Sequence, residues 1–158
     1  MLFASPIFLS VFLPATVGTA LLTRKRLPLQ NGLLVLWSLL FYAWGDPLNT
    51  PVLLGSVALN GACGRLAAHR PRLGTALAVV FDLSLLFLFK YVGFFAESLN
   101  AATGLSLPVP SLALPLGISF FTFQGLSYVL DVARGSAKPC GNPLDLALYI
   151  CFFPQLIA

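Results

Sequence analysis

Long apolar runs without charged side chains, separated by short charged or Pro/Gly-rich segments, dominate the chain. No Asp, Glu, Lys or Arg occurs in 1–23, 27–45 or 47–64, and 73–89 contains only Asp82. A membrane-spanning helix needs about 20 mostly apolar residues, whereas the strands of a membrane barrel would alternate apolar and polar positions. The pattern predicts an all-α, polytopic transmembrane helical bundle with five complete spans, at 4–22, 30–44, 50–67, 73–89 and 113–131.

A sixth span is expected to begin near Pro143 and to be cut off by the end of the chain. Asn142 can cap the free N–H groups of a helix, and Pro143 suits the first helical position. Asp145 would then lie in the first turn, where the helix dipole favours a negative charge. In the first span, Pro6 and Pro14 are expected to disturb the helix.

Composition supports the membrane assignment. The 158 residues contain 9 Lys and Arg and 5 Asp and Glu, which is 9% charged, with 58% hydrophobic residues and a mean hydropathy of +0.92. Soluble domains carry roughly 25% charged residues, and disordered chains are poor in apolar ones, so both classes are excluded. The phenylalanines are expected mostly on the lipid-facing surface, with Tyr42, Trp44 and Tyr91 at the interface.

Basic residues in the predicted loops give the orientation. Successive loops contain 3, 0, 3, 1 and 2 Lys or Arg residues. Because cytoplasmic loops are enriched in Lys and Arg, the N-terminus is predicted outside and 24–29, 66–72 and 132–141 are predicted to be cytoplasmic. The net charge of +4 therefore indicates topology and not nucleic-acid binding.

Several polar residues inside the apolar runs are candidates for chemistry or for helix packing. Asp82 lies near mid-membrane, where a carboxylate is costly unless it is partnered, and a structural hydrogen bond between helices is the favoured interpretation. Gln124 can line a cavity or bridge helices, on a face shared with Gly117, Phe121 and Gly125. Asp131 and Arg134, three residues apart, can form an ion pair.

Neither a catalytic group nor a metal site can be assigned from spacing. His69 is the single histidine and is expected to lie in a wet loop between arginines. The three cysteines form no CxxC motif and have no histidine at metal-ligand spacing. From the residues alone, no metal, no bound cofactor and no reaction can be assigned.

Five phrases, taken in order along the chain, resemble the membrane-bound O-acyltransferase family in its alginate O-acetyltransferase branch. They are FASPIFLSVFLP at 3–14, FYAW at 41–44, the D-L-x-x-L-x-x-F-K-Y phrase at 82–91, LPLGISFFTFQGLSYVLDVARG at 114–135 and FFPQLIA at 152–158. The D-alanyl transferases of teichoic acid share the phrase at 114–135. The resemblance thus leaves the acyl group open.

The resemblance implies that 1–158 are the N-terminal part of a single, longer acyltransferase domain in a bacterial inner membrane. The whole enzyme would transfer an acyl group, in the first place acetyl, from a thioester-type donor to hydroxyls of an exported polysaccharide such as alginate. The catalytic histidine would lie downstream, and His69 does not match it. The expected partners are the bilayer, the polysaccharide acceptor and periplasmic or membrane proteins of the acetylation machinery.

Within this chain, the candidates for lining a passage through the bundle are Gln124, Phe153, Pro154 and Gln155. Two other classes stay open at this point. One is a secondary transporter subunit, in which Asp82 would be the coupling carboxylate. The other is a non-catalytic membrane scaffold.

Overall fold

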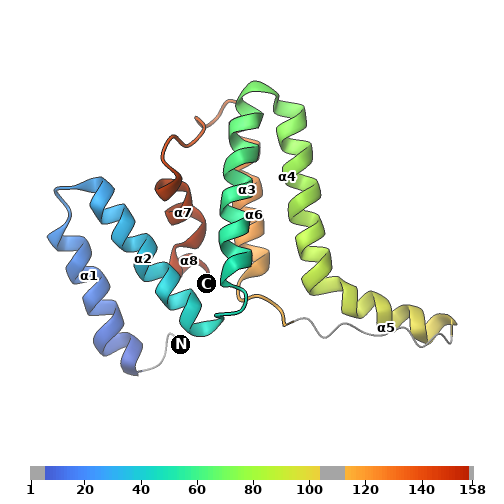
Figure 1. Cartoon of the computed structure of the whole chain (residues 1–158), viewed down its shortest axis with the longest axis horizontal. Coiled ribbons are helices and arrows are strands. Elements are labelled where there is room, and N and C mark those ends of the chain that lie inside the picture. Colours follow the sequence, from blue (N-terminus) through green and yellow to red (C-terminus); the bar gives the residue numbers. More distant parts are fainter. Residues whose placement is uncertain (1–5, 104–112, 157–158) are drawn as a thin grey trace.

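The computed structural model describes residues 6–103 and 113–156, and within these ranges the regular structure is helical (Figure 1). In chain order the elements are the π-helical turn η1 (Phe8–Phe12), α1 (Leu13–Leu22), α2 (Leu27–Gly45), α3 (Thr50–His69), α4 (Pro71–Leu86), the π-helical turn η2 (Phe87–Tyr91), α5 (Val92–Thr103), α6 (Ile118–Ala133), α7 (Pro143–Cys151) and α8 (Phe153–Leu156).

Helices α3, α4 and α6 pack against one another and form the centre of the bundle. Small residues allow the close approach, as is usual between membrane helices. A Cβ at Gly74 of α4 would lie 2.5 Å from the backbone nitrogen of Ala67 in α3, and one at Gly64 of α3 would overlap the ring of Tyr128 in α6. Helix α7 packs on α2 and α3, and α1 packs on α2, which extends the bundle to one side (Figure 1).

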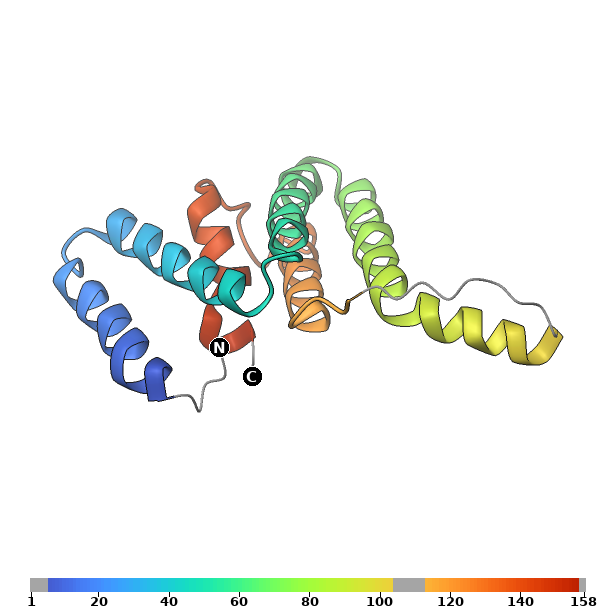
Figure 2. The same ribbon diagram turned by 60° about the horizontal axis from the view of Figure 1, so that its bottom comes forward.

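The three basic connections lie at the same end of the molecule. Figure 1 shows the α1–α2, α3–α4 and α6–α7 connections on one side of the bundle and the α2–α3 connection on the other; Figure 2 keeps this arrangement. We call the first side the basic end, since it holds Arg24, Lys25, Arg26, Arg65, Arg70, Arg72, Arg134 and Lys138. This grouping is the one that the predicted topology requires. Which end faces the cytoplasm stays a prediction.

Three helical stretches are long and apolar enough to cross a membrane: Leu27–Gly45, Thr50–His69 and Pro71–Thr103. The shorter apolar stretches are Phe8–Leu22, Ile118–Ala133 and Pro143–Leu156. The described residues are therefore helical as predicted, with three apolar helices that are consistent with a membrane protein, and the count of five complete spans stays a prediction. The α3–α4 connection is tighter than expected, because α3 ends at His69 and α4 begins at Pro71.

The fourth helix does not end at 89 as predicted. It continues through η2 into α5, which turns away from the bundle axis (Figures 1 and 2). The physical reason is local: no Pro interrupts 90–103. The next prolines along the chain, Pro108 and Pro110, lie outside the described residues.

The aromatic residues at the N-terminal side correct a second expectation. Phe8, Phe12, Phe41 and Phe153 are buried together, at most 8% exposed, and Trp37 and Phe152 pack against them. We call this set the aromatic cluster. Its rings are not on the lipid face, because η1 and α8 both pack on α2 and bring them together, with ring centroids such as those of Phe12 and Phe153 5.4 Å apart. Tyr42 is likewise buried, at 1% exposure, and is not an interface residue, while Trp44 and Tyr91 are exposed.

Candidate functional site

The last helix is interrupted in the apolar part of the chain. After α7 ends at Cys151, Phe152 adopts an extended ψ of 112°, and α8 starts at Phe153. Pro154 has no N–H, so the interruption frees the carbonyl groups of the preceding turn. Backbone groups at membrane depth need replacement partners, because lipid offers none. A break of this kind is tolerated where protein or a water-filled cavity surrounds it.

Side chains from α2 and α6 provide partners for the freed backbone groups. The Phe153 N–H donates to Ser38 Oγ at 3.3 Å. On the other side, Gln124 Nε2 donates to the Tyr149 carbonyl oxygen at 2.7 Å. In an unbroken helix the Phe153 N–H would have bonded to this same carbonyl. Gln124 therefore replaces a main-chain hydrogen bond.

Two sequence-predicted site residues, Gln124 and Gln155, meet at this break. Gln124 Nε2 also donates to Gln155 Oε1 at 3.1 Å. The other polar atom of the same amide, Gln124 Oε1, is buried without a hydrogen-bond partner among the described residues. A buried acceptor of this kind costs about 1–3 kcal/mol unless something donates to it. The break therefore holds an unused acceptor next to an amide pair.

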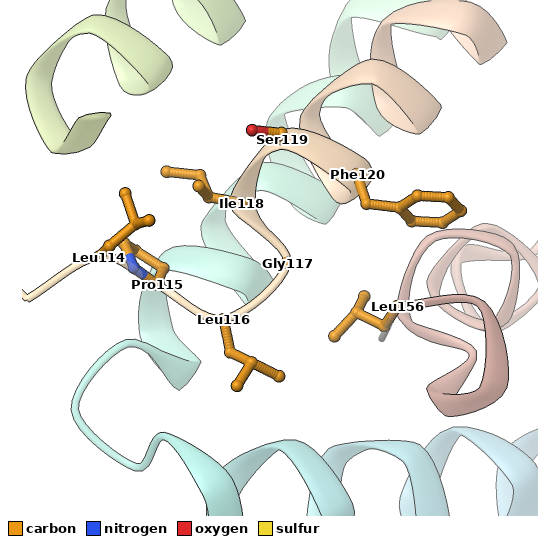
Figure 3. A pocket seen from close by; sticks show the side chains of 8 residues that line it. All are labelled: Leu114, Pro115, Leu116, Gly117, Ile118, Ser119, Phe120 and Leu156. Carbon is orange, nitrogen blue, oxygen red and sulfur yellow. The ribbon is translucent and has the colours of Figure 1, made fainter. Parts of the chain in front are cut away.

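A trough runs along α6 beside the break. It has a volume of about 530 Å³ and is lined by Ser119, Phe120, Phe123, Gln124, Ser127 and Tyr149. A second hollow, of about 330 Å³, adjoins it and shares Ser119 and Phe120; Figure 3 shows its lining, with Leu156 of α8 facing the start of α6. Lys90 reaches the same place from η2, because its Nζ donates to Ser119 Oγ at 3.3 Å.

The turn that leads into α6 is fixed by Asp46, a residue that is not among the predicted site residues. Asp46 Oδ2 accepts the Leu116 N–H at 3.1 Å, and the Asn49 side chain donates to both carboxylate oxygens. Next comes Gly117, at a left-handed φ of 68°, where a Cβ would lie 2.5 Å from the Leu156 carbonyl oxygen. The Asp-x-x-Asn spacing at 46–49 is the signal that could have pointed to this role.

Asp82 lies in the centre of the bundle at 1% exposure. Its partner is Asn60 of α3, whose Nδ2 donates to Asp82 Oδ1 at 3.1 Å and to the Ser56 carbonyl oxygen at 3.1 Å. Sequence reasoning expected a partner but did not name Asn60, although an Asn in the apolar run 47–64 was a visible signal. Asp82 Oδ2 and Asn60 Oδ1 have no partner among the described residues.

The remaining predicted residues are placed apart from the trough. Phe153 belongs to the aromatic cluster, and Pro154 is exposed. Asp131 lies near the basic end, where it lines a separate hollow together with Lys138, and Arg134 follows at the end of α6. A passage-lining role for Phe153 and Pro154 and an ion pair between Asp131 and Arg134 stay predictions.

His69 is the exposed last residue of α3 and not part of a longer loop. Its Nδ1 lies 3.1 Å from the Arg65 carbonyl oxygen. It sits at the basic end, whereas the trough runs along the half of α6 that begins at the opposite end. Within 6–103 and 113–156, no group of three or more His, Cys, Asp or Glu residues is arranged to hold a metal ion.

Comparison with curated proteins finds similar sequences over the whole chain. A probable alginate O-acetylase of Pseudomonas syringae pv. tomato is 36% identical over 169 residues, which cover 100% of this chain and 32% of that protein. Its counterpart in Pseudomonas aeruginosa is 37% identical over 168 residues, again covering 100% of this chain and 32% of the relative. A peptidoglycan O-acetyltransferase of Helicobacter pylori is 34% identical over 191 residues, covering 100% of this chain and 36% of the relative.

The chain thus spans about a third of the length of these relatives. No family model matches the chain. No solved structure matches it either.

Proposed function

Because this chain belongs to the membrane-bound O-acyltransferase family, we propose that the protein transfers an acyl group, in the first place acetyl, to a hydroxyl of an exported polysaccharide. The observation that carries the proposal is the whole-chain similarity to O-acetylases of two different polymers, alginate and peptidoglycan. The names of both relatives have O-acetyl transfer to a polysaccharide in common. The experiment below tests which polymer accepts the acyl group from this protein.

The reaction needs a base and an activated acyl donor. The acceptor hydroxyl oxygen attacks the acyl carbon of a thioester-type donor, a new C–O bond forms, and the C–S bond breaks. The hydroxyl proton passes to a general base, which must lie within about 3 Å of it, directly or through one water. The thiolate leaves and takes up a proton. In this proposal the base is a histidine beyond residue 158, which is what the family resemblance implies.

In this proposal the chain supplies part of the bundle around the reaction and no catalytic group. His69 is exposed at the basic end and is not placed to act as the base. The polar side chains that line the trough are Ser119, Gln124 and Ser127, and Gln155 bonds to Gln124 beside it. Lipid, the polysaccharide and proteins of an acetylation machinery are the proposed partners, in a bacterial inner membrane.

The proposal is tested by complementation with the protein expressed from its full reading frame. Cells that make alginate but lack their own O-acetylase should regain acetyl esters, measured as ester content of the purified exported polymer. Peptidoglycan and teichoic acid from matching deletion strains should be assayed in parallel for acetyl and D-alanyl esters. Esters on another of these polymers would reassign the acceptor or the acyl group. If no polymer gains esters, the result would contradict the proposed acyltransferase activity. It would favour a non-catalytic scaffold or a transporter subunit.

Two further results are expected from the same assay. Residues 1–158 alone should restore no esters, because the catalytic histidine is proposed to lie beyond residue 158. In the full protein, His69→Ala should retain most of the activity, since His69 lies far from the trough. Two results would contradict a downstream histidine as the base. One is the restoration of esters by residues 1–158, and the other is a more than tenfold loss of activity on His69→Ala.

A further inference from the structure

We propose that α5 (Val92–Thr103) is an interfacial helix, which lies along the membrane surface opposite the basic end. Its Phe95 side is inserted among the lipids, and its Glu97 side faces water. The partner that this helix fits is thus the phospholipid bilayer, at the level of the headgroups. This placement is independent of the proposed acyl transfer, because it follows from the length, the bend and the side chains of one helical stretch.

The helical stretch Pro71–Thr103 is too long to cross a bilayer as a single straight span. Its 33 residues correspond to about 50 Å at 1.5 Å per residue, against roughly 30 Å of hydrocarbon. A straight helix of this length would need a tilt of about 50°, outside the range of about 0–40° that membrane helices show. By contrast, α4 and η2 have 16 and 5 residues and together reach about 31 Å. The bilayer is therefore crossed where η2 ends, and α5 begins at its surface.

The residues at the bend are of the types that mark a membrane interface. Lys90 and Tyr91 end η2, and Lys and Tyr near the ends of membrane helices place their polar groups at the level of the headgroups. Lys90 Nζ donates to Ser119 Oγ at 3.3 Å, in the first turn of α6. The bend is therefore level with the start of a second apolar helix. Figures 1 and 2 both show α5 leaving the bundle at this end and running to the side.

The described part of the chain leaves α5 uncovered. None of the residues of α5 is buried, and its main neighbour among the described elements is η2. Phe94 and Phe95 are exposed by 70% and 58%. Two phenylalanine side chains in water are unfavourable, because apolar surface gains free energy when it leaves water. Lipid at the membrane surface removes this cost without any further protein contact.

The side chains of α5 separate into an apolar and a polar face. Phe95, Leu99 and Ala102 share one face at helical spacing, and Glu97 lies on the opposite face. The ring of Phe95 packs against that of Phe87 in η2, with the centroids 6.2 Å apart. This contact spans the bend, so the apolar face lies on its inner side, towards the helix that crosses the membrane. Interfacial helices divide their surface in this way and insert the apolar face.

The charge of α5 indicates how the helix is held. Glu97 is the single charged residue in 92–103. Helices that depend on anionic lipids carry Lys or Arg on their polar face, and α5 carries neither. Its attachment therefore comes from apolar insertion, and the depth of the helix should not depend on the charge of the lipid.

The first experiment measures depth with single spin labels on the full-length protein without native cysteines, in vesicles of phosphatidylethanolamine and phosphatidylglycerol. Each label reports its collisions with oxygen, which is concentrated in lipid, and with a water-soluble nickel chelate. The ratio of oxygen to nickel collisions should be about threefold or more higher at Phe95→Cys and Ala102→Cys than at Glu97→Cys, because only the first two lie on the inserted face. Leu83→Cys on α4 and Lys25→Cys in the α1–α2 connection, both exposed on the bundle, are the references for lipid and for water.

The second experiment removes the apolar anchor. With the label at Ala102→Cys, the added substitution Phe95→Glu should lower the collision ratio about threefold, towards the value in water, because a carboxylate stays out of lipid. Glu97→Gln is the matched control and should leave the ratio unchanged, since Glu97 is on the face in water. Vesicles of phosphatidylcholine alone should give the same ratios as those with phosphatidylglycerol. A fall of the ratio in phosphatidylcholine would contradict apolar insertion.

Three patterns of the first experiment would overturn the interfacial placement. Ratios typical of lipid at Phe95→Cys, Ala102→Cys and Glu97→Cys alike would mean that α5 is immersed in the hydrocarbon. Ratios typical of water at all three would mean that α5 stands clear of the membrane. Few collisions with either agent at Phe95→Cys and Ala102→Cys would mean that protein, and not lipid, covers the apolar face.

Discussion

At the residue scale, the pair formed by Asn60 and Asp82 connects α3 to α4 in the centre of the bundle. Both side chains are at most 1% exposed. Asn60 uses both of its amide hydrogens, on Asp82 Oδ1 and on the Ser56 carbonyl, while one oxygen of each partner stays unpaired among the described residues. Such buried polar pairs fix which helix faces meet, because any other packing leaves several groups unsatisfied.

Substitutions at Asp82 test this pair. Asp82→Asn should preserve stability or raise it, because its Oδ1 still accepts from Asn60 and its new amide can donate to Asn60 Oδ1. Asp82→Leu should lower the free energy of unfolding by about 1–3 kcal/mol, since it strands the Asn60 amide. The measurement is thermal unfolding of the full-length protein in detergent. Equal stability of the two variants would contradict a specific role for the pair.

A glycine opposite Asn60 allows α6 to approach the pair. A Cβ at Gly125 would lie 2.5 Å from Asn60 Nδ2. Gly125→Ala should therefore destabilise the protein by about 1–3 kcal/mol through overpacking. Gly55→Ala on α3 is the matched control, because nothing lies within 4 Å of its Cβ, and it should be neutral or stabilising by up to about 1 kcal/mol. A neutral Gly125→Ala would contradict the close approach of α6 to α3.

At the scale of the elements, the irregular points of the chain position more of the candidate site's side chains than the regular helices do. The turns η1 and η2, the start of α6 and the break between α7 and α8 place the aromatic cluster, Lys90, Gly117 and Gln124. Three of these four irregularities have a local cause, and nothing in the structure explains η2. Pro14 cannot donate a hydrogen bond at the start of α1, Pro154 cannot donate within α8, and Gly117 adopts a positive φ that other residues avoid.

Substitution of Gly117 should destabilise the protein for two separable reasons. Gly117→Ala places a Cβ 2.5 Å from the Leu156 carbonyl oxygen and puts Ala at a φ of 68°, whereas Gly135→Ala has the strained φ of 76° with nothing within 4 Å. The left-handed conformation alone costs roughly 1–2 kcal/mol. Both variants should lower the unfolding temperature in detergent, with the larger drop for Gly117→Ala. Equal drops would show that α8 yields to the added methyl group.

At the scale of the whole molecule, the two ends of the bundle differ in their content of basic residues. Connections that are far apart in sequence bring eight basic residues to one end, which is the distribution that membrane insertion uses to orient a protein. The trough and Lys90 belong to the other half.

Cysteine labelling tests the orientation. In a variant of the full protein without native cysteines, Lys25→Cys in the α1–α2 connection should resist an impermeant thiol reagent in intact cells. Leu48→Cys, 85% exposed in the α2–α3 connection, should react. Permeabilised cells provide the control for reactivity of both sites. Labelling of Lys25→Cys from outside would reverse the topology and place the trough mouth in the cytoplasm.

The sequence by itself determined the class of the protein and the grouping of its loops. Helical membrane structure follows from apolar runs and few charges, and the basic connections follow from counting; both are local properties that need no knowledge of packing. The Asn142 cap was predictable for the same reason, and its Oδ1 accepts the Leu144 N–H. The extent of the fourth helix was misjudged, because the charge-free run ends at Lys90 but no proline interrupts 90–103, and a charged side chain does not stop a helix.

The tertiary structure alone decided which polar groups meet. Asn60 bonds to Asp82 22 positions later, Gln124 to Tyr149 and Gln155 25 and 31 positions later, and Asp46 to Leu116 70 positions later. The aromatic cluster joins Phe8 to Phe153 in the same way. A helix pattern gives the face on which a residue lies but not the neighbouring helix that covers it. In a chain this apolar nearly every face is compatible with burial, so the few polar side chains select their partners only when the bundle packs.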